Sequence, residues 1–176
     1  MLKRILKFLL RGGITIDLRR LFEKGLRMNG KYEMTRGEKN DNPLNIRESA
    51  TDRTQWQGER PTDDDTAFEE FKTPTFGIRA GALILCKYQE DYRLLTVQDI
   101  IAKWAPPTDN NPTRTYIEFV AKKMDVMVDQ EIDILKNPEL FCKLIMAMIT
   151  FENGRCIYDP TIIMEGIDLA LQRIQE

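Results

Sequence analysis

Signals for the start of a helix recur through the second half of this chain, and they constrain its fold more than any other feature. Three of them pair an amide or carboxylate residue with proline: Asn111-Pro112, Asn137-Pro138 and Asp159-Pro160. The first residue of such a pair can cap the free N–H groups of a new helix. Proline suits the first helical position because no N–H is needed there. We therefore predict that a helix begins at each pair.

Apolar residues at helical spacing follow these signals. The last predicted helix, for example, carries Ile163, Ile167, Ala170 and Ile174 on one face. Two more helices are expected, one within residues 77–92 and one that Thr96 opens. Stripes of this kind are typical of helices packed around a core. The predicted fold class is therefore mainly α.

Residues 34–76 lack this periodicity, since prolines and glycines interrupt them. The stretch AFEEFKT, residues 67–73, is compatible with one short strand anchored by Phe68 and Phe71. The acidic run at residues 63–65 is predicted to be a solvated loop. We expect a short β or loop-rich patch beside the helical body.

The first 33 residues differ from the rest in charge. They hold nine Lys and Arg against three acidic residues, so they carry +6 and residues 34–176 carry −8. Apolar residues recur at helical spacing in residues 2–9 and 18–26. This basic N-terminal arm has two open interpretations. It is either a pair of helices docked on the main domain, or an extension that binds a partner protein or an anionic membrane surface.

Composition excludes several classes of protein. The net charge of −2 argues against a nucleic-acid binder driven by bulk electrostatics. No apolar run approaches the roughly 18–20 residues that a membrane span needs. The three cysteines lack metal-like spacing, and the absence of histidine removes Ser-His and Cys-His catalysis and His-ligated zinc. We expect no metal and no cofactor, so an enzyme of this composition must transfer protons with carboxylates.

Two glutamates are candidates for that role. Glu152 ends an apolar helix just before Gly154, which suits a helix C-terminus. The helix dipole and desolvation both favour its protonated form, as a general acid requires. The alternative is an outward-facing residue paired with Arg155. Glu38, flanked by two cations, should stay ionised and suits a base; its alternative is a solvated loop acid.

Amides and aromatic rings could complete a site. Asparagines are frequent in the segment RGEKNDNPLNIR, residues 36–47, which we call the asparagine loop. Sugars present apolar faces and hydroxyl rims, so aromatic rings with amides suit a saccharide groove, although such rings are more often just half-buried. Tyr116 lies near a helix end, as the other aromatic candidates do. The candidate substrate-binding residues are Asn42, Asn45, Trp56, Tyr88, Trp104 and Tyr158.

Five segments of residues 34–171, taken in order, carry a resemblance to a known family. They are TRGEKNDNPLNIR, TQWQGE, AFEEFKTPTFGIRAGALILCKYQ, TVQDIIAKWAPPTDNNPTRTYIEFVAKKM and MITFENGRCIYDPTIIMEGIDLAL. The series resembles phage and prophage virion proteins of the lysozyme-like, peptidoglycan-cleaving superfamily. Members of that family typically carry an Asn-Asn-Pro-Gly-Asn-Ile-Arg signature near the start.

The resemblance implies a lysozyme-like α+β domain over residues 34–176 that cleaves the MurNAc–GlcNAc bond of peptidoglycan. It implies a lytic transglycosylase, or else a muramidase, in which one glutamate acts as both general acid and general base. Such a protein would reside in the virion, bind other virion proteins through residues 1–33, and open the bacterial cell wall locally during genome entry. The alternatives are a catalytically inactive lysozyme-like docking protein of the virion and an unrelated helical adaptor.

Two departures from the family accompany the resemblance. Many lysozyme-like enzymes have the helix that ends in the catalytic glutamate before the Asn/Gly-rich loop, whereas here the order is reversed. Circular permutation would explain this, and it predicts that the Glu152 carboxyl and the backbone of residues 42–47 line one cleft. The second departure is Leu44, where the family usually has glycine. If that position requires a positive φ, leucine is costly there and the loop takes another shape.

Overall fold

The computed structural model describes residues 33–49, 54–62 and 64–174. The chain divides into two compact units, Met1–Glu33 and Met34–Glu176, and the first coincides with the basic arm. The two helices predicted in the arm lie outside the described residues. The described helices all belong to the second unit.

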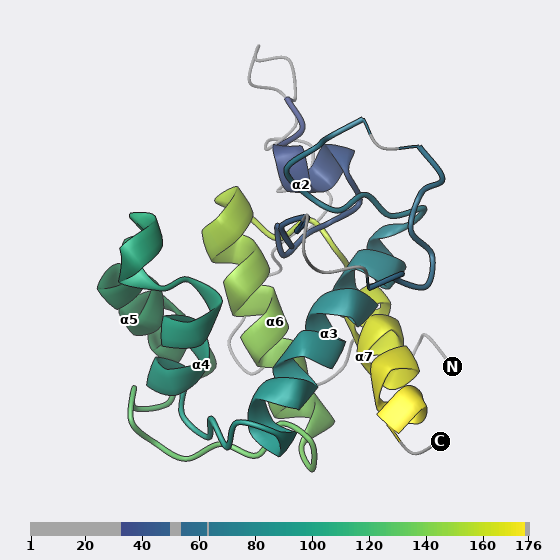
Figure 1. Ribbon diagram of the computed structural model, residues 1–176. Coiled ribbons are helices and arrows are strands. Elements are labelled where there is room, and N and C mark those ends of the chain that lie inside the picture. Colours follow the sequence, from purple (N-terminus) through teal and green to yellow (C-terminus); the bar gives the residue numbers. More distant parts are fainter. Residues whose placement is uncertain (1–32, 50–53, 63, 175–176) are drawn as a thin grey trace, which may run out of the picture. The chain divides into compact units, whose positions relative to one another are not determined.

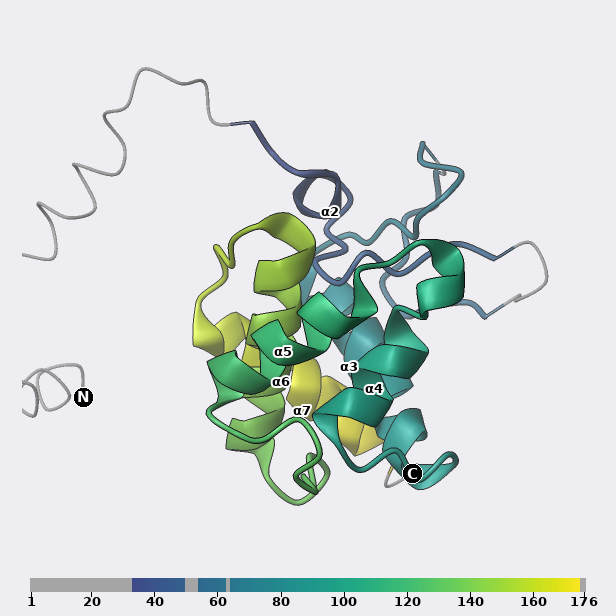
Figure 2. The ribbon, with the colours of Figure 1, turned by 90° about the vertical axis from the view of Figure 1, so that its left-hand side faces the viewer.

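The second unit is built mainly of helices, as the sequence predicts (Figure 1). α6 packs against α5 on one side and against α7 on the other, while α7 also packs on α3 and α4 on α5 (Figures 1 and 2). None of the described helices is long and apolar enough to cross a bilayer. The helices are α2 (Arg36–Lys39), α3 (Pro74–Glu90), α4 (Val97–Trp104), the 3₁₀ helix η2 (Pro107–Asp109), α5 (Thr113–Met124), α6 (Pro138–Asn153) and α7 (Pro160–Ile174).

Side-chain caps start three of these helices at the predicted residues. The Thr96 hydroxyl accepts from the Asp99 N–H at 3.1 Å. Asn137 accepts from the Leu140 N–H at 3.0 Å, and the Asp159 carboxylate accepts from an N–H in the first turn of α7 at 2.9 Å. Each bond satisfies a helix N–H that has no partner within its own helix.

The other two helix starts differ from prediction. α5 begins at Thr113 with Pro112 as its cap, because the Asn111 amide donates instead to the Pro106 carbonyl at 3.1 Å. α3 begins at Pro74, three residues before the expected Gly77, because proline is well suited to the first helical turn.

The predicted strand over residues 67–73 is not formed. Within the described residues, Phe68 and Phe71 make only isolated antiparallel bridges, to Arg47 and Glu59 respectively. Charged side chains hold this patch together in place of a strand ladder. Arg60 donates to the carboxylates of Asp41 and Glu70 and to the carbonyls of Lys39 and Phe71.

The asparagine loop lies directly on α3. Leu44 is fully buried, and its side chain fills the space that a Cβ on Gly81 would occupy. Leu44 is not among the residues with positive φ, whereas Asp41 (51°) and Asn45 (50°) are. Asn and Asp tolerate that conformation best after glycine. The expected strain at Leu44 is therefore absent, and leucine instead anchors the loop in the core.

Gly77, one turn earlier on α3, lets the backbone of the loop approach the helix. A Cβ there would collide with the Asp41 carbonyl oxygen. We expect Gly77→Ala to destabilise the protein by about 1–3 kcal/mol through overpacking. The gain in helix propensity, about 0.5–1 kcal/mol, is smaller.

Urea unfolding of Gly77→Ala beside Gly81→Ala measures this effect. Gly81→Ala should cost less, since the colliding atom is the end of the Leu44 side chain, which can rotate, whereas a carbonyl cannot. An increase in stability for Gly77→Ala would contradict this account of the packing.

Candidate active site

Glu152 lies in the last turn of α6, which ends at Gly154 in the left-handed conformation (φ 71°). Side chains from other parts of the chain donate to its carboxylate. The Tyr116 hydroxyl on α5 donates to Oε1 at 3.0 Å, and the Asn45 amide donates to Oε2 at 3.3 Å. Glu152 is thus held inward by both oxygens, and the outward-facing alternative does not apply.

Tyr116 is itself held firmly in place. It is 1% exposed, and its ring stacks on Phe151 with centroids 3.8 Å apart and planes at 12°. Burial and the neighbouring Glu152 carboxylate raise the pKa of Tyr116 well above its ordinary value. The hydroxyl therefore remains a hydrogen-bond donor at any physiological pH.

Asn45 reaches Glu152 because the loop around it is internally bonded. The side chain of Asn42 donates to the Ile46 and Glu69 carbonyls, both at 2.9 Å, and accepts from the Ile46 N–H at 2.9 Å. Asn42 is completely buried, so it shapes the loop and has no exposed surface for a ligand. Asn153 adds a link from α6, since its amide donates to the Pro43 carbonyl at 2.7 Å.

Glu152 and the asparagine loop line one pocket of about 330 Å³. The ends of α3 and α4 contribute two of its aromatic residues, Tyr88 and Trp104, whose rings meet edge to face at 6.4 Å. The pocket thus combines apolar ring surfaces with amides and charged groups. It is lined by Asn45, Ile46, Arg47, Phe68, Ile84, Tyr88, Trp104, Ala105, Asp109, Asn111 and Glu152.

Burial raises the pKa of the Glu152 carboxyl above its ordinary value. Hydrogen bonds from Asn45, Tyr116 and Trp104 and the charge of Arg47 oppose this shift, since each stabilises the ionised form. A carboxyl poised in this way can give up a proton and take it back, as general acid–base catalysis requires.

The hydrogen bond from Tyr116 gives a testable pH dependence. Any reaction that needs protonated Glu152 should decline as the pH rises through the raised pKa of this group. Tyr116→Phe removes a donor that favours the carboxylate, so the pKa should rise further and the alkaline limb should move to higher pH. A pH–rate profile of both proteins measures the shift, and a move to lower pH would contradict it.

The second predicted catalytic residue, Glu38, does not line the pocket. It is 4% exposed and forms a bidentate ion pair with Arg155, at 2.8 and 2.7 Å. It also completes a capping box with Thr35 at the start of α2. Arg155 therefore pairs with Glu38 and not, as the alternative for Glu152 supposed, with Glu152 itself. These bonds are those of a structural residue.

The predicted ligand-binding residues separate into two groups. Asn45, Tyr88 and Trp104 line the pocket. Asn42, Trp56 and Tyr158 do not. Asn42 is buried within the loop, whereas Trp56 and Tyr158 are half-buried against the core, and the Trp56 indole donates to Glu69 at 3.3 Å.

The sequence assigned no role to the side chains of three polar residues of the pocket, Arg47, Asp109 and Asn111, although the backbone of residues 42–47 was expected to line this cleft with Glu152. Asp109 lies in the short η2 helix, which the sequence did not predict. Only the folding of distant segments brings these side chains beside Glu152. Within the described ranges, no group of three or more residues could hold a metal ion.

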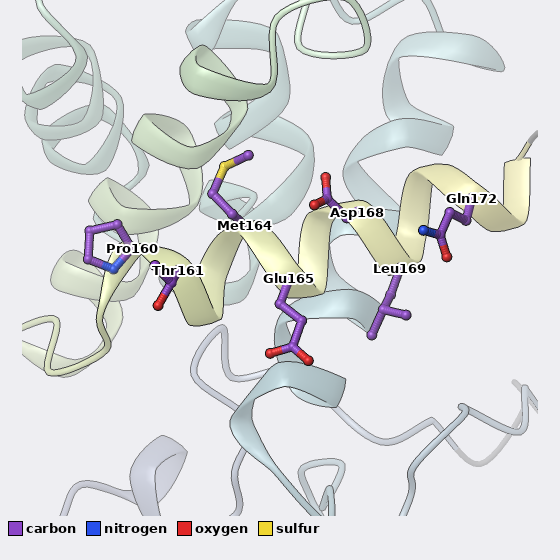
Figure 3. Close-up of a pocket in the computed structure, with 7 residues that line it drawn as sticks. All are labelled: Pro160, Thr161, Met164, Glu165, Asp168, Leu169 and Gln172. Carbon is purple, nitrogen blue, oxygen red and sulfur yellow. The ribbon is translucent and has the colours of Figure 1, made fainter. Parts of the chain in front are cut away.

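A second hollow, of about 490 Å³, follows the surface of α7 between Pro160 and Gln172. All of its lining residues come from this one helix (Figure 3). In the close-up, Met164 and Asp168 project to one side of the helix and Glu165 and Leu169 to the other (Figure 3). Because these side chains do not converge, the hollow offers less for chemistry than the Glu152 pocket.

Comparison with known proteins identifies a relative. No protein-family profile matches the chain. Protein P5 of Pseudoalteromonas phage PM2 is 45% identical to it over 136 residues, which cover 77% of this chain and 82% of that protein. Identity at this level over most of both chains means common descent and a shared fold. The chain therefore belongs to the family of protein P5 of Pseudoalteromonas phage PM2.

Proposed function

We propose that this chain is a virion-associated enzyme that cleaves the glycan strands of peptidoglycan. The observation that carries the proposal is the state of Glu152, a largely buried carboxyl with a raised pKa, held by Tyr116 and Asn45. Its pocket also holds aromatic and amide side chains, which suit a sugar.

The chemistry needs only one carboxyl group. Protonated Glu152 donates its proton to the glycosidic oxygen as the bond from that oxygen to the anomeric carbon of MurNAc breaks. The resulting carboxylate then takes the proton from the MurNAc 6-hydroxyl as that oxygen bonds to the anomeric carbon. The products are a 1,6-anhydro-MurNAc end and a free GlcNAc 4-hydroxyl, and Glu152 is again protonated.

Hydrolysis is the other outcome that this pocket could support. Asp109 is the second carboxylate among its described lining residues. A glycosidase that uses water needs a second carboxylate about 5–9.5 Å from the acid, as nucleophile or base. Hydrolysis would leave a reducing MurNAc end instead of the anhydro form.

The proposed fold is a lysozyme-like domain whose order of segments is circularly permuted. The bond between Asn45 and Glu152 supports this, because it joins residues 107 positions apart and brings the early asparagine loop to the late end of α6. The asparagine loop and the helix that ends in Glu152 thus line one pocket although their order in the sequence is reversed.

The relative's phage origin and the basic unit at residues 1–33 support a location in the virion. In this proposal the arm binds other virion proteins and keeps the enzyme on the particle. The enzyme then opens the cell wall locally when the genome enters.

Incubation of the purified protein with peptidoglycan sacculi tests the proposal. Mass spectrometry of the released fragments should show 1,6-anhydro-MurNAc ends, whereas reducing ends would identify a muramidase. Absence of released fragments at every pH would reject the enzyme in favour of a structural lysozyme-like protein of the virion.

A further inference from the structure

Arg47 is the one cation among the described residues that line the Glu152 pocket. It forms an antiparallel bridge with Phe68, so the two side chains lie side by side. The guanidinium carbon lies 5.1 Å from the centre of the Phe68 ring, within the range of a cation–π contact. The side chain is exposed yet has a preferred position at the pocket.

A second arginine, Arg36, lies on the same Phe68 ring and differs from Arg47 in having a carboxylate partner. The guanidinium of Arg36 lies 4.5 Å from the ring centre of Phe68 and binds the Asp65 carboxylate through two hydrogen bonds, of 2.7 and 3.0 Å. Arg47 forms no ion pair with any residue in the described part of the chain. Within the described residues, one of two neighbouring guanidinium groups is therefore neutralised by a carboxylate and the other is not.

Neither carboxylate of the pocket, Glu152 or Asp109, forms an ion pair with Arg47 in the described part of the chain. Arg47 is close enough to Glu152 to stabilise its ionised form. However, the proposed reaction begins with Glu152 protonated, so at that stage the two groups do not neutralise each other. An anionic group on the substrate would fill this role, and the planar guanidinium fork matches a carboxylate through two hydrogen bonds.

We propose that Arg47 binds a carboxylate of the glycan substrate and so selects peptidoglycan over uncharged glycans. This inference rests on the proposed function. Peptidoglycan offers the carboxylate in two ways. It is the lactyl group of MurNAc where no peptide is attached, and the acidic groups of the stem peptide where one is. Polymers of N-acetylglucosamine alone have none.

The test compares four preparations of the same glycan strands. One bears stem peptides, one has been stripped by an amidase to free the lactyl carboxylates, and each of these is also converted to its methylamide. The wild-type kcat/KM should fall about tenfold on conversion, the loss expected for one charge-assisted hydrogen bond. An effect on the stripped strands assigns the contact to the lactyl group. An effect confined to peptide-bearing strands assigns it to the stem peptide.

Arg47→Met should lower kcat/KM about tenfold on the unmodified strands and abolish the difference between carboxylate and methylamide. Arg47→Lys, which keeps the charge but not the fork, should recover part of that difference. Arg36→Met is the matched control, since the Arg36 side chain lies on the same Phe68 ring but does not line the pocket. This variant should distinguish carboxylate from methylamide strands as the wild type does. The assay pH must lie well below the alkaline limb of activity, because losing Arg47 also raises the pKa of Glu152.

Equal wild-type rates on carboxylate and methylamide strands would overturn the role of Arg47. So would an Arg47→Met protein that still discriminates, or one that is slowed on both types of strand with the difference unchanged. Glu152→Gln is included on each strand: if it is inactive where the wild type is active, the proposed function stands even when the role of Arg47 fails. Strands that the wild type does not cleave at all would reject both.

Discussion

Glu152→Gln is expected to lower kcat on peptidoglycan by about a hundred- to ten-thousand-fold, the usual contribution of a general acid–base group. Glutamine keeps the shape of the side chain and can still accept from Tyr116, but it cannot donate a proton to the glycosidic oxygen. The release of soluble fragments from sacculi, followed over time, measures the loss. Glu165→Gln on the exposed face of α7 is the matched control and should retain full activity.

The same substitution should leave the folded protein intact. Because the pKa of Glu152 is raised on folding, the folded state holds this proton more tightly than the unfolded state does. Stability is therefore lost as the pH rises from the unfolded pKa to the folded pKa. Glu152→Gln should remove that decline, as urea unfolding over this range would show. A full-activity Glu152→Gln protein would reject the assignment of the acid.

Arg155→Met is expected to have the largest effect on stability, a loss of about 3 kcal/mol. It would leave the carboxylate of Glu38, whose side chain is 2% exposed, without its bidentate partner. The value is at the lower end of the range for a broken buried ion pair, because the Arg155 side chain is 39% exposed and water already reaches it.

Denaturant unfolding of Arg155→Met beside Arg114→Met measures this loss. Arg114 pairs with Glu118, but its side chain is 93% exposed, so its removal should leave stability essentially unchanged. If both variants lost the same stability, the Glu38–Arg155 pair would be no more than a surface ion pair.

The features predicted correctly from the sequence depend on near neighbours. Asn137 caps a residue three positions away, and Gly154 ends α6 by its own conformation. Such local rules also predicted the mainly helical class. They misplaced the start of α5, because Asn111 binds a carbonyl of the preceding turn instead of capping the helix.

The features that could not be predicted depend on residues far apart in the chain. Glu38 resembles a solvated acid among its neighbours, and its partner Arg155 lies 117 positions away. Phe68 and Phe71 favoured a strand by their local pattern. The ion pairs that hold this patch in a loop conformation join residues far apart in the chain, so local periodicity does not reveal them. Asp109 and Asn111 join the pocket only through the packing of separate segments.

The long separation between Asn45 and Glu152 also governs when the site can first exist. During translation the asparagine loop leaves the ribosome early, whereas Glu152 is added only 107 residues later, when α7 alone of the described helices remains to be made. Fragments that end before α6 lack the acid altogether. Under the proposed function, fragments of this kind could not cleave the glycan strands of peptidoglycan.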